Sequence, residues 1–317
     1  MKRDWKSLAV RGIKLLAAGA ILLYIGRRFV DDLEQLDFDT LELRPEWLAI
    51  SGALYLFSLL PGVWYWHHLH RQFGYPIPTY AALRAHYIAQ LGKYVPGKTL
   101  ALLMRAHLTH PFGVPYGVSI IISFYEVLTM MAAGGIVAAV IYALEPPGDL
   151  QLGLHPVAIG AILVGMCGIP LLPAVFNFIV ARLSARIQAV ELYRLPSLRF
   201  GPLMRGLALG VVLWWVQGLS WYAMLQGVLP TPPAFTMSLW AQCTASIAFA
   251  NVAGFVLIVI PGGLGVREWL LVNLLNFAGP GPYLTAAAIL LRLDWIVMEA
   301  IFTLCVYWIR PAEPDAQ

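Results

Sequence analysis

Two short segments carry the residues best suited to bind an anion. The first motif, residues 92–99, reads GKYVPGKT and combines a Pro-Gly break with two lysines. The second motif, residues 261–268, reads PGGLGVRE and places an arginine after three glycines. Glycines let the backbone approach a ligand closely, and a helix that starts after such a break presents free amides and the positive end of its dipole. Both motifs are therefore predicted to bind an anion such as phosphate.

The residues predicted to form this anion site are cations and glycines of the two motifs, together with two arginines outside them. They are Lys93, Gly97, Lys98, Arg105, Gly262, Gly263, Gly265, Arg267 and Arg292, and the helix breaks are Pro96 and Pro261. A lysine supplies a point charge, whereas an arginine can pair with two phosphate oxygens in a forked geometry. Each motif also has a plainer interpretation, as an interfacial lysine beside a structural break or as a flexible turn followed by a surface Arg-Glu pair.

The first motif also matches the nucleotide-binding pattern G-x-x-x-x-G-K-T. That pattern binds nucleotides when it lies between a strand and a helix of a parallel sheet. The flanking sequence here is typical of a membrane protein, with no following strand and no clear acidic magnesium ligand. Nucleotide binding is therefore not expected, and no cofactor or metal is predicted.

The composition defines the class of protein. Of the 317 residues, 60% are hydrophobic and only 12% are charged. Soluble domains carry about 25% charged residues, so we predict an all-α, polytopic integral membrane protein. The net charge of +4 does not indicate nucleic-acid binding, because in a membrane protein the distribution of Lys and Arg matters more than their total.

The apolar segments and the Pro-Gly breaks predict about six full spans plus two broken, re-entrant helical hairpins. The spans are residues 8–29, 47–66, 116–144, 154–180, 206–229 and 284–309, and the hairpins are residues 79–110 and 236–278. The basic N-terminus and the arginine-rich residues 182–205 are assigned to the cytoplasm by the positive-inside rule. Both termini are thus expected on the cytoplasmic side of the cell (inner) membrane.

This order of segments predicts one transmembrane domain made of two inverted repeats, residues 1–150 and 151–317. Each repeat holds one broken hairpin, and the two hairpins enter the membrane from opposite sides. Inverted repeats are common in transporters, where broken helices meet near the middle of the bilayer and form the substrate site. We therefore expect the two motifs to lie close together.

Several charges lie within predicted membrane segments and should face the protein interior. Glu126, Glu268 and Asp294 are expected to pair with cations there, and the favoured salt bridge joins Glu126 to Arg292 across the two repeats. A purely structural role for that pair is equally open. Glu299 is expected either to pair in the same way or to lie near the interface.

The histidines form no pattern that predicts a metal site. His67, His68 and His70 follow a span end without acidic or cysteine partners, and His107 and His110 lie one helical turn apart. An interfacial position is expected for all of them.

The two motifs resemble those of the lysylphosphatidylglycerol synthase transmembrane-region family, also called the flippase-like family. Residues 92–98 and 261–268 carry the resemblance, and Glu126 and Arg292 fall where the family carries charge. The family often shows Glu-Arg followed by Asp around the first of these positions, whereas this chain reads EVLT at residues 126–129. The bifunctional members also carry a soluble aminoacyl-transferase domain, and we expect a stand-alone member without it.

The resemblance implies the membrane half of the family's function, which is movement of a lipid or of a polar-headed lipid carrier between leaflets. We therefore expect a flippase-like transporter rather than an enzyme, with an anionic headgroup held in a basic cavity between the hairpins. One alternative is a membrane enzyme that modifies a lipid-phosphate headgroup, with Glu126, Glu268 or Asp294 as base. Another is a scaffold that recruits a separate lipid synthase. The expected partners are a membrane phospholipid or lipid-linked carrier, with a soluble lipid-modifying enzyme and a second copy of the chain as further candidates and no nucleic acid.

Overall fold

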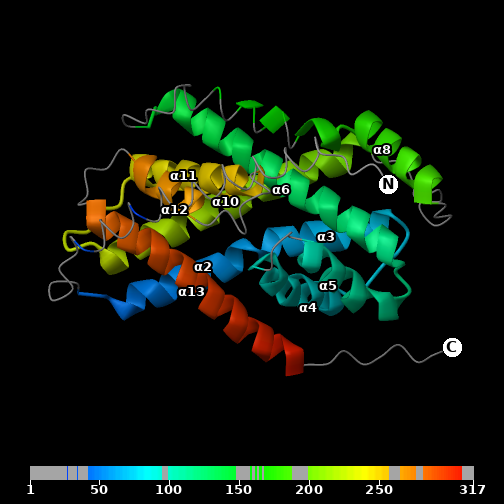
Figure 1. Cartoon of the computed structure of the whole chain (residues 1–317), viewed down its shortest axis with the longest axis horizontal. Coiled ribbons are helices and arrows are strands. Elements are labelled where there is room, and N and C mark those ends of the chain that lie inside the picture. Colours follow the sequence, from blue (N-terminus) through cyan, green and yellow to red (C-terminus); the bar gives the residue numbers. More distant parts are fainter. Residues whose placement is uncertain are drawn as a thin grey trace, which may run out of the picture.

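The computed structural model describes most of the chain. The described residues are 42–94, 99–147, 168–187, 199–256, 265–275 and 281–308, with isolated residues 27, 34, 158, 161, 162, 164 and 165. Every regular element within these ranges is helical and none is a strand (Figure 1), so the predicted all-α fold is confirmed. Four predicted anion-site residues lie outside the described ranges, namely Gly97, Lys98, Gly262 and Gly263. The predicted breaks Pro96 and Pro261 and nearly all of the predicted span 8–29 also lie outside them.

Within the described ranges, four helical stretches are long and apolar enough to cross a membrane. They are α2 (Pro45–Ser58) continued by α3 (Leu60–Gln72), then α6 (Tyr116–Leu144), α10 (Phe200–Val228) and α11 (Met237–Val256). The predicted span 116–144 coincides with α6. These helices make the chain a multi-pass membrane protein.

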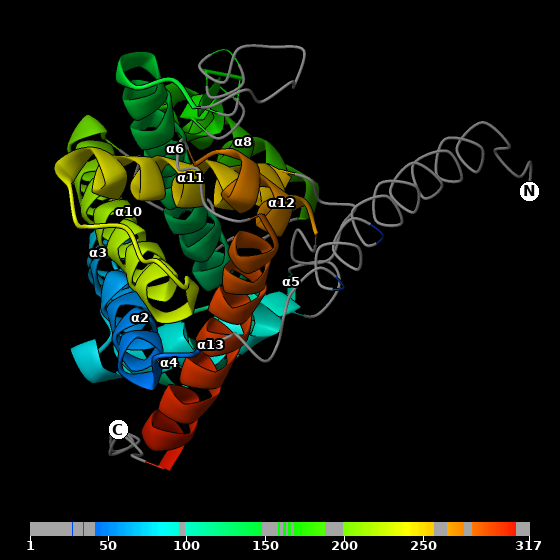
Figure 2. The ribbon, with the colours of Figure 1, turned by 90° about the vertical axis from the view of Figure 1, so that its left-hand side faces the viewer.

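The other helices are shorter or carry more charge. They are α4 (Thr79–Gln90), η1 (Leu91–Tyr94), α5 (Thr99–Thr109), η2 (His110–Phe112), η3 (Ile169–Leu171), α8 (Pro173–Ile187), α12 (Val266–Asn273) and α13 (Gly281–Trp308). The helices α4 and α5 flank the first motif and pack against each other, and α11 and α12 flank the second and do the same. Figures 1 and 2 both place these two pairs on opposite sides of the molecule.

Two predicted segments differ from the structure. The predicted single span 154–180 is interrupted by the short helix η3, after which α8 starts at Pro173. Pro170 and Pro173 lack the amide hydrogen that would continue the helix, which accounts for the break. The second pair, predicted as a re-entrant hairpin at 236–278, contains α11, which is by itself long and apolar enough to cross the whole membrane.

The helix α10 is the centre of the packing, since it contacts α2, α3, α6 and α11. Small residues allow these close approaches. A Cβ atom at Gly210 would lie 2.5 Å from Ala133 of α6, and one at Gly218 would lie 2.8 Å from the Thr244 backbone of α11. Membrane helices commonly associate through such positions, because the hydrophobic effect does not drive packing within lipid.

The first motif depends on a similar contact. A Cβ atom at Gly92 in η1 would lie 2.7 Å from the backbone nitrogen of Ala101 in α5. Glycine is therefore needed where the chain after α4 passes α5. The helix α13, in red, crosses α2 in Figure 1 and also contacts α4, which brings the end of the chain to the first helix pair.

Substitution of Gly218 by Ala tests the α10–α11 contact. The added methyl group would meet the backbone of Thr244, and overpacking of this kind costs about 1–3 kcal/mol. We expect a clearly lower Tm in detergent, measured by the loss of helical circular dichroism on heating.

Gly201→Ala is the matched control, since Gly201 lies on the same helix with nothing within 4 Å of a Cβ atom. Alanine has the higher helix propensity, so this variant should be as stable as the wild type or slightly more so. Equal Tm values for the two variants would contradict the proposed close contact.

Candidate functional site

A cavity of about 390 Å³ lies between the two halves of the chain. Side chains from α2, α4, η1, α5, α6, α10, α11, α12 and α13 form its wall. The cations in that wall are Lys93, Arg105, Arg267 and Arg292. The volume falls within the range of small-ligand sites, roughly 300–1,000 Å³. The cavity is therefore basic and large enough for a small polar molecule or headgroup.

Lys93 is held at the cavity wall by two groups from distant elements. Its ammonium donates hydrogen bonds to the Tyr55 hydroxyl of α2, at 2.8 Å, and to Oε1 of Glu299 in α13. The Tyr55 hydroxyl donates to the same carboxylate oxygen. Glu299 is fully buried, whereas the Lys93 side chain retains 32% of its exposed surface. Glu299 thus neutralises the ammonium, while the Lys93 side chain as a whole remains partly exposed at the cavity wall.

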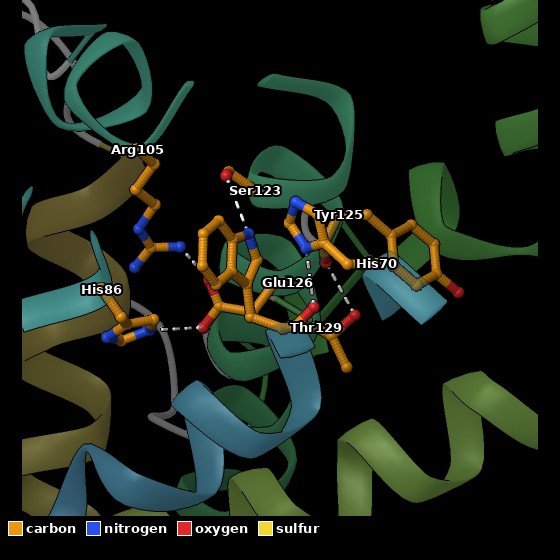
Figure 3. A network of polar contacts seen from close by, with 8 residues as sticks. His70, His86, Arg105, Ser123, Tyr125, Glu126 and Thr129 are labelled. Carbon is orange, nitrogen blue, oxygen red and sulfur yellow. Dashed lines mark hydrogen bonds and ion pairs between the residues drawn. The ribbon is translucent and has the colours of Figure 1, made fainter. Parts of the chain in front are cut away.

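Arg105 forms a second ion pair, with Glu126 of α6. Figure 3 shows Arg105 and His86 approaching this carboxylate from the same side. Arg105 Nη1 lies 2.6 Å from Glu126 Oε2, and His86 Nε2 lies 3.6 Å from Oε1. The guanidinium also lies over the ring of Trp66, at 5.3 Å from its centroid, and the Trp66 indole donates to Ser123. These contacts fix α5 to α3 and α6.

Glu268 organises the start of α12. Its Oε1 accepts a hydrogen bond of 2.7 Å from Arg292 Nη1 of α13, and its Oε2 accepts one of 2.7 Å from the Gly265 amide. Gly265 adopts a φ of 82°, which favours glycine. The anion at this helix start is therefore the chain's own carboxylate, and the Gly265 amide already has a partner.

Arg267 differs from the other three cations. Its guanidinium lies over the Trp295 ring, 4.5 Å from the centroid, and Trp295 in turn stacks on Tyr55 at 4.0 Å. Within the described part of the chain it forms no ion pair, and its buried Nε and Nη2 atoms have no hydrogen-bond partner. A cation–π contact stabilises the charge without using these donors.

The structure thus brings together Lys93, Arg105, Arg267 and Arg292, all of which were predicted anion-site residues. It places Gly265 beside them, at the start of α12. Asp294, a predicted pairing residue, does not line the cavity. It faces Gly52 of α2, where a Cβ atom would lie 2.9 Å from its Oδ1.

The predicted salt bridge between Glu126 and Arg292 is wrong. Glu126 pairs with Arg105, and Arg292 pairs with Glu268. The reason is helix adjacency, because α5 packs against α6 and α12 packs against α13. Arg105 and Arg292 therefore each pair with a carboxylate on a neighbouring helix of the same half of the chain. Lys93, in contrast, pairs with Glu299 of the other half.

The histidines have separate partners. His67 Nε2 donates to the Ile77 carbonyl, His70 Nδ1 donates to the Trp66 carbonyl, and His68 Nε2 accepts from Arg205. Among the described residues, no three potential metal ligands lie together.

Several cavity residues carry no motif and were not predicted as site residues. They are Tyr55, His86, Gln217, Asn251 and Trp295. Gln217 and Asn251 gave a usable signal, since an amide within an apolar membrane segment should face the protein interior. Tyr55 and Trp295 are indistinguishable in sequence from ordinary packing aromatics.

Comparison with known families places the chain. A family model described as "Lysylphosphatidylglycerol synthase TM region" matches residues 12–298, which is most of the sequence. No curated protein matches the chain.

The buried Arg105–Glu126 pair can be tested by breaking it from one side. Glu126→Gln leaves a buried guanidinium without a counter-charge, and losses of this kind are about 3–5 kcal/mol. The double variant Arg105→Met, Glu126→Gln removes both charges and should recover part of that loss. Thermal unfolding in detergent measures both Tm values.

Glu46→Gln serves as the control, because Glu46 is an exposed carboxylate at the start of α2 and should be close to neutral. A double variant less stable than Glu126→Gln would show that the pair does not act as described.

Proposed function

The chain belongs to the lysylphosphatidylglycerol synthase TM-region family, and on this premise we propose that it moves an anionic phospholipid or lipid-linked headgroup between membrane leaflets. The chemistry required is transient binding of a phosphate within a membrane-embedded protein. An unpaired phosphate within hydrocarbon is strongly unfavourable, so a transporter must replace its water with protein cations. The observation that carries the proposal is one cavity lined by Lys93, Arg105, Arg267 and Arg292.

The balance of charge in the cavity supports reversible binding. Three of the four cations have a carboxylate partner, and Arg267 has none among the described residues. A transport site must bind its substrate and also release it, so a moderate excess of positive charge suits this purpose better than four unpaired cations. The three glutamates that pair with these cations also keep the helices around the cavity in place when no substrate is bound.

The size of the cavity indicates which part of a lipid enters. A volume of about 390 Å³ accommodates a headgroup. The acyl chains would remain in the bilayer, where they need no protein surface. Movement would be passive or ion-coupled, because the nucleotide-like pattern at residues 92–99 lies in membrane sequence.

Transport is favoured over lipid chemistry by the state of the carboxylates. An enzyme would need Glu126, Glu268 or Asp294 as a base, yet an arginine holds each of the two glutamates, and Asp294 does not line the cavity. Such pairing stabilises the ionised carboxylate and makes it a weak proton acceptor. A scaffold that recruits a soluble lipid synthase would need no basic cavity. We place the protein in the cell (inner) membrane with both termini cytoplasmic, as the distribution of basic residues predicts.

Reconstitution into liposomes tests the proposal. The purified protein should accelerate the movement of tail-labelled fluorescent phosphatidylglycerol between leaflets, measured as the fraction bleached by a membrane-impermeant reductant. Arg267→Gln removes the unpaired cation, and a hydrogen bond to a charged group is worth about 1.5–3 kcal/mol. The rate should therefore fall by about ten- to a hundredfold.

Arg199→Gln is the control, since Arg199 is exposed at the start of α10 and does not line the cavity. This variant should match the wild type. Equal rates for protein-free liposomes and wild-type proteoliposomes would rule out transport of this lipid. Mass spectrometry of the recovered lipid would expose a chemical modification, which would favour the enzyme instead.

A further inference from the structure

The cavity contains a buried acceptor in addition to its cations. Gln217 of α10 lines the cavity and is only 5% exposed. Its side-chain oxygen Oε1 is buried without a hydrogen-bond partner in the described part of the structure. A buried polar group without a partner destabilises the fold, so its presence calls for a physical reason.

A second amide of the same helix shows the usual arrangement. The Gln226 side chain donates a hydrogen bond of 2.6 Å to the Pro233 carbonyl, and Gln226 does not line the cavity. Asn251 of α11 lines the cavity, and its side-chain nitrogen donates to the Ile247 carbonyl of its own helix. That bond uses the nitrogen and leaves the carbonyl oxygen of Asn251 uninvolved in it.

The Arg267 donors complement these acceptors. The unpartnered atoms Nε and Nη2 belong to one planar guanidinium, whose fixed fork matches two oxygens of a phosphate. The Trp295 ring covers one face of this guanidinium, so its edge is the part that remains for a ligand.

Trp295 also connects Arg267 to Gln217. The Trp295 indole donates a hydrogen bond of 3.2 Å to Ser220, which lies three residues after Gln217. Residues three apart share one face of a helix. One aromatic side chain therefore contacts Arg267 through its ring face and the helix face of Gln217 through its nitrogen, and all three residues line the same cavity.

We propose that Arg267 and Gln217 form a two-point site for a phosphate ester that also carries a hydrogen-bond donor, namely a hydroxyl or an N–H group. Arg267 binds two phosphate oxygens, and the Gln217 carbonyl accepts the hydrogen bond from the group beyond the phosphate. The Asn251 carbonyl offers a second acceptor. Phosphoethanolamine and phosphoglycerol headgroups carry such a donor, and phosphocholine carries none. The site thus distinguishes headgroups by their donor and not by their charge alone. This inference deepens the proposed function and rests on the same cavity.

Binding of short-chain lipids to the purified full-length protein tests the site without requiring transport. Dioctanoyl phosphatidylethanolamine and dioctanoyl phosphatidylcholine have the same net charge, so their affinity ratio isolates the donor. We expect the wild type to bind the ethanolamine lipid about fivefold more tightly, which corresponds to one hydrogen bond of about 1 kcal/mol. Native mass spectrometry or tryptophan fluorescence measures the two dissociation constants.

Gln217→Met keeps the length of the side chain and removes the strong acceptor. It should bring the ratio to about one without weakening the choline lipid, whereas Arg267→Gln should weaken both lipids about tenfold or more. Gln226→Met is the matched control on the same helix and should keep the wild-type ratio. An equal affinity of the wild type for the two lipids, or an unchanged ratio in Gln217→Met with a wild-type Tm, would overturn the proposal.

The same assay separates this site from the transport proposal. If the lipids bind with the expected preference while liposomes show no movement between leaflets, the site stands and transport fails. Soluble glycerol 3-phosphate provides a competitor with the same recognition groups. If it binds and phosphatidylglycerol does not, the ligand is a soluble phosphate ester, and lipid transport again fails while the two-point site stands.

Discussion

Ion pairing between helices that are distant in sequence is the interaction on which this cavity depends. A charged side chain within a membrane protein is tolerated when it faces the interior and meets a partner. The helix α13 supplies one ion-pair partner to each motif. Its Glu299 binds Lys93 of the first motif, and its Arg292 binds Glu268 of the second. One helix therefore positions both motifs. These ion pairs join the short helices around the cavity to α13.

The predictability of the fold from sequence varied with the uniformity of each segment. The predicted span 116–144 coincided with α6, because a long apolar segment without an internal proline has one stable solution in lipid. Prolines made the outcome ambiguous. Pro61 lies where α2 passes into α3 within one candidate span, whereas Pro170 lies in η3 and separates α8 from the helical residues before it. Neighbouring helices decide whether the freed backbone groups find partners, and the sequence does not contain that information.

The site was predictable in its components and not in its pairings. The two motifs identified Lys93 and Arg267 as cavity residues, because a cation beside a helix break is unfavourable in lipid and should instead face the protein interior or a polar cavity. The partner of Glu126 could not be identified in this way. Matching positions in two repeats favoured Arg292, but a salt bridge also requires adjacent helices and compatible rotation about their axes, and Arg105 met both conditions. Gln217 belonged to no motif, so its significance emerged from its unpartnered oxygen.

The four cations of the cavity differ in what holds them, and this difference separates structural roles from ligand binding. Lys93 and Arg292 are each neutralised by a glutamate, and their main effect is to hold elements together while adding positive potential to the cavity. Arg267 is held by the face of Trp295, an interaction that leaves its hydrogen-bond donors free. An aromatic support is the arrangement that fixes a guanidinium within the protein and still leaves its edge for a ligand. Trp295 also stacks on Tyr55, and the Tyr55 hydroxyl bridges Lys93 and Glu299. An anion bound at Arg267 would therefore be connected, through the stacked rings of Trp295 and Tyr55, to the Lys93–Glu299 ion pair.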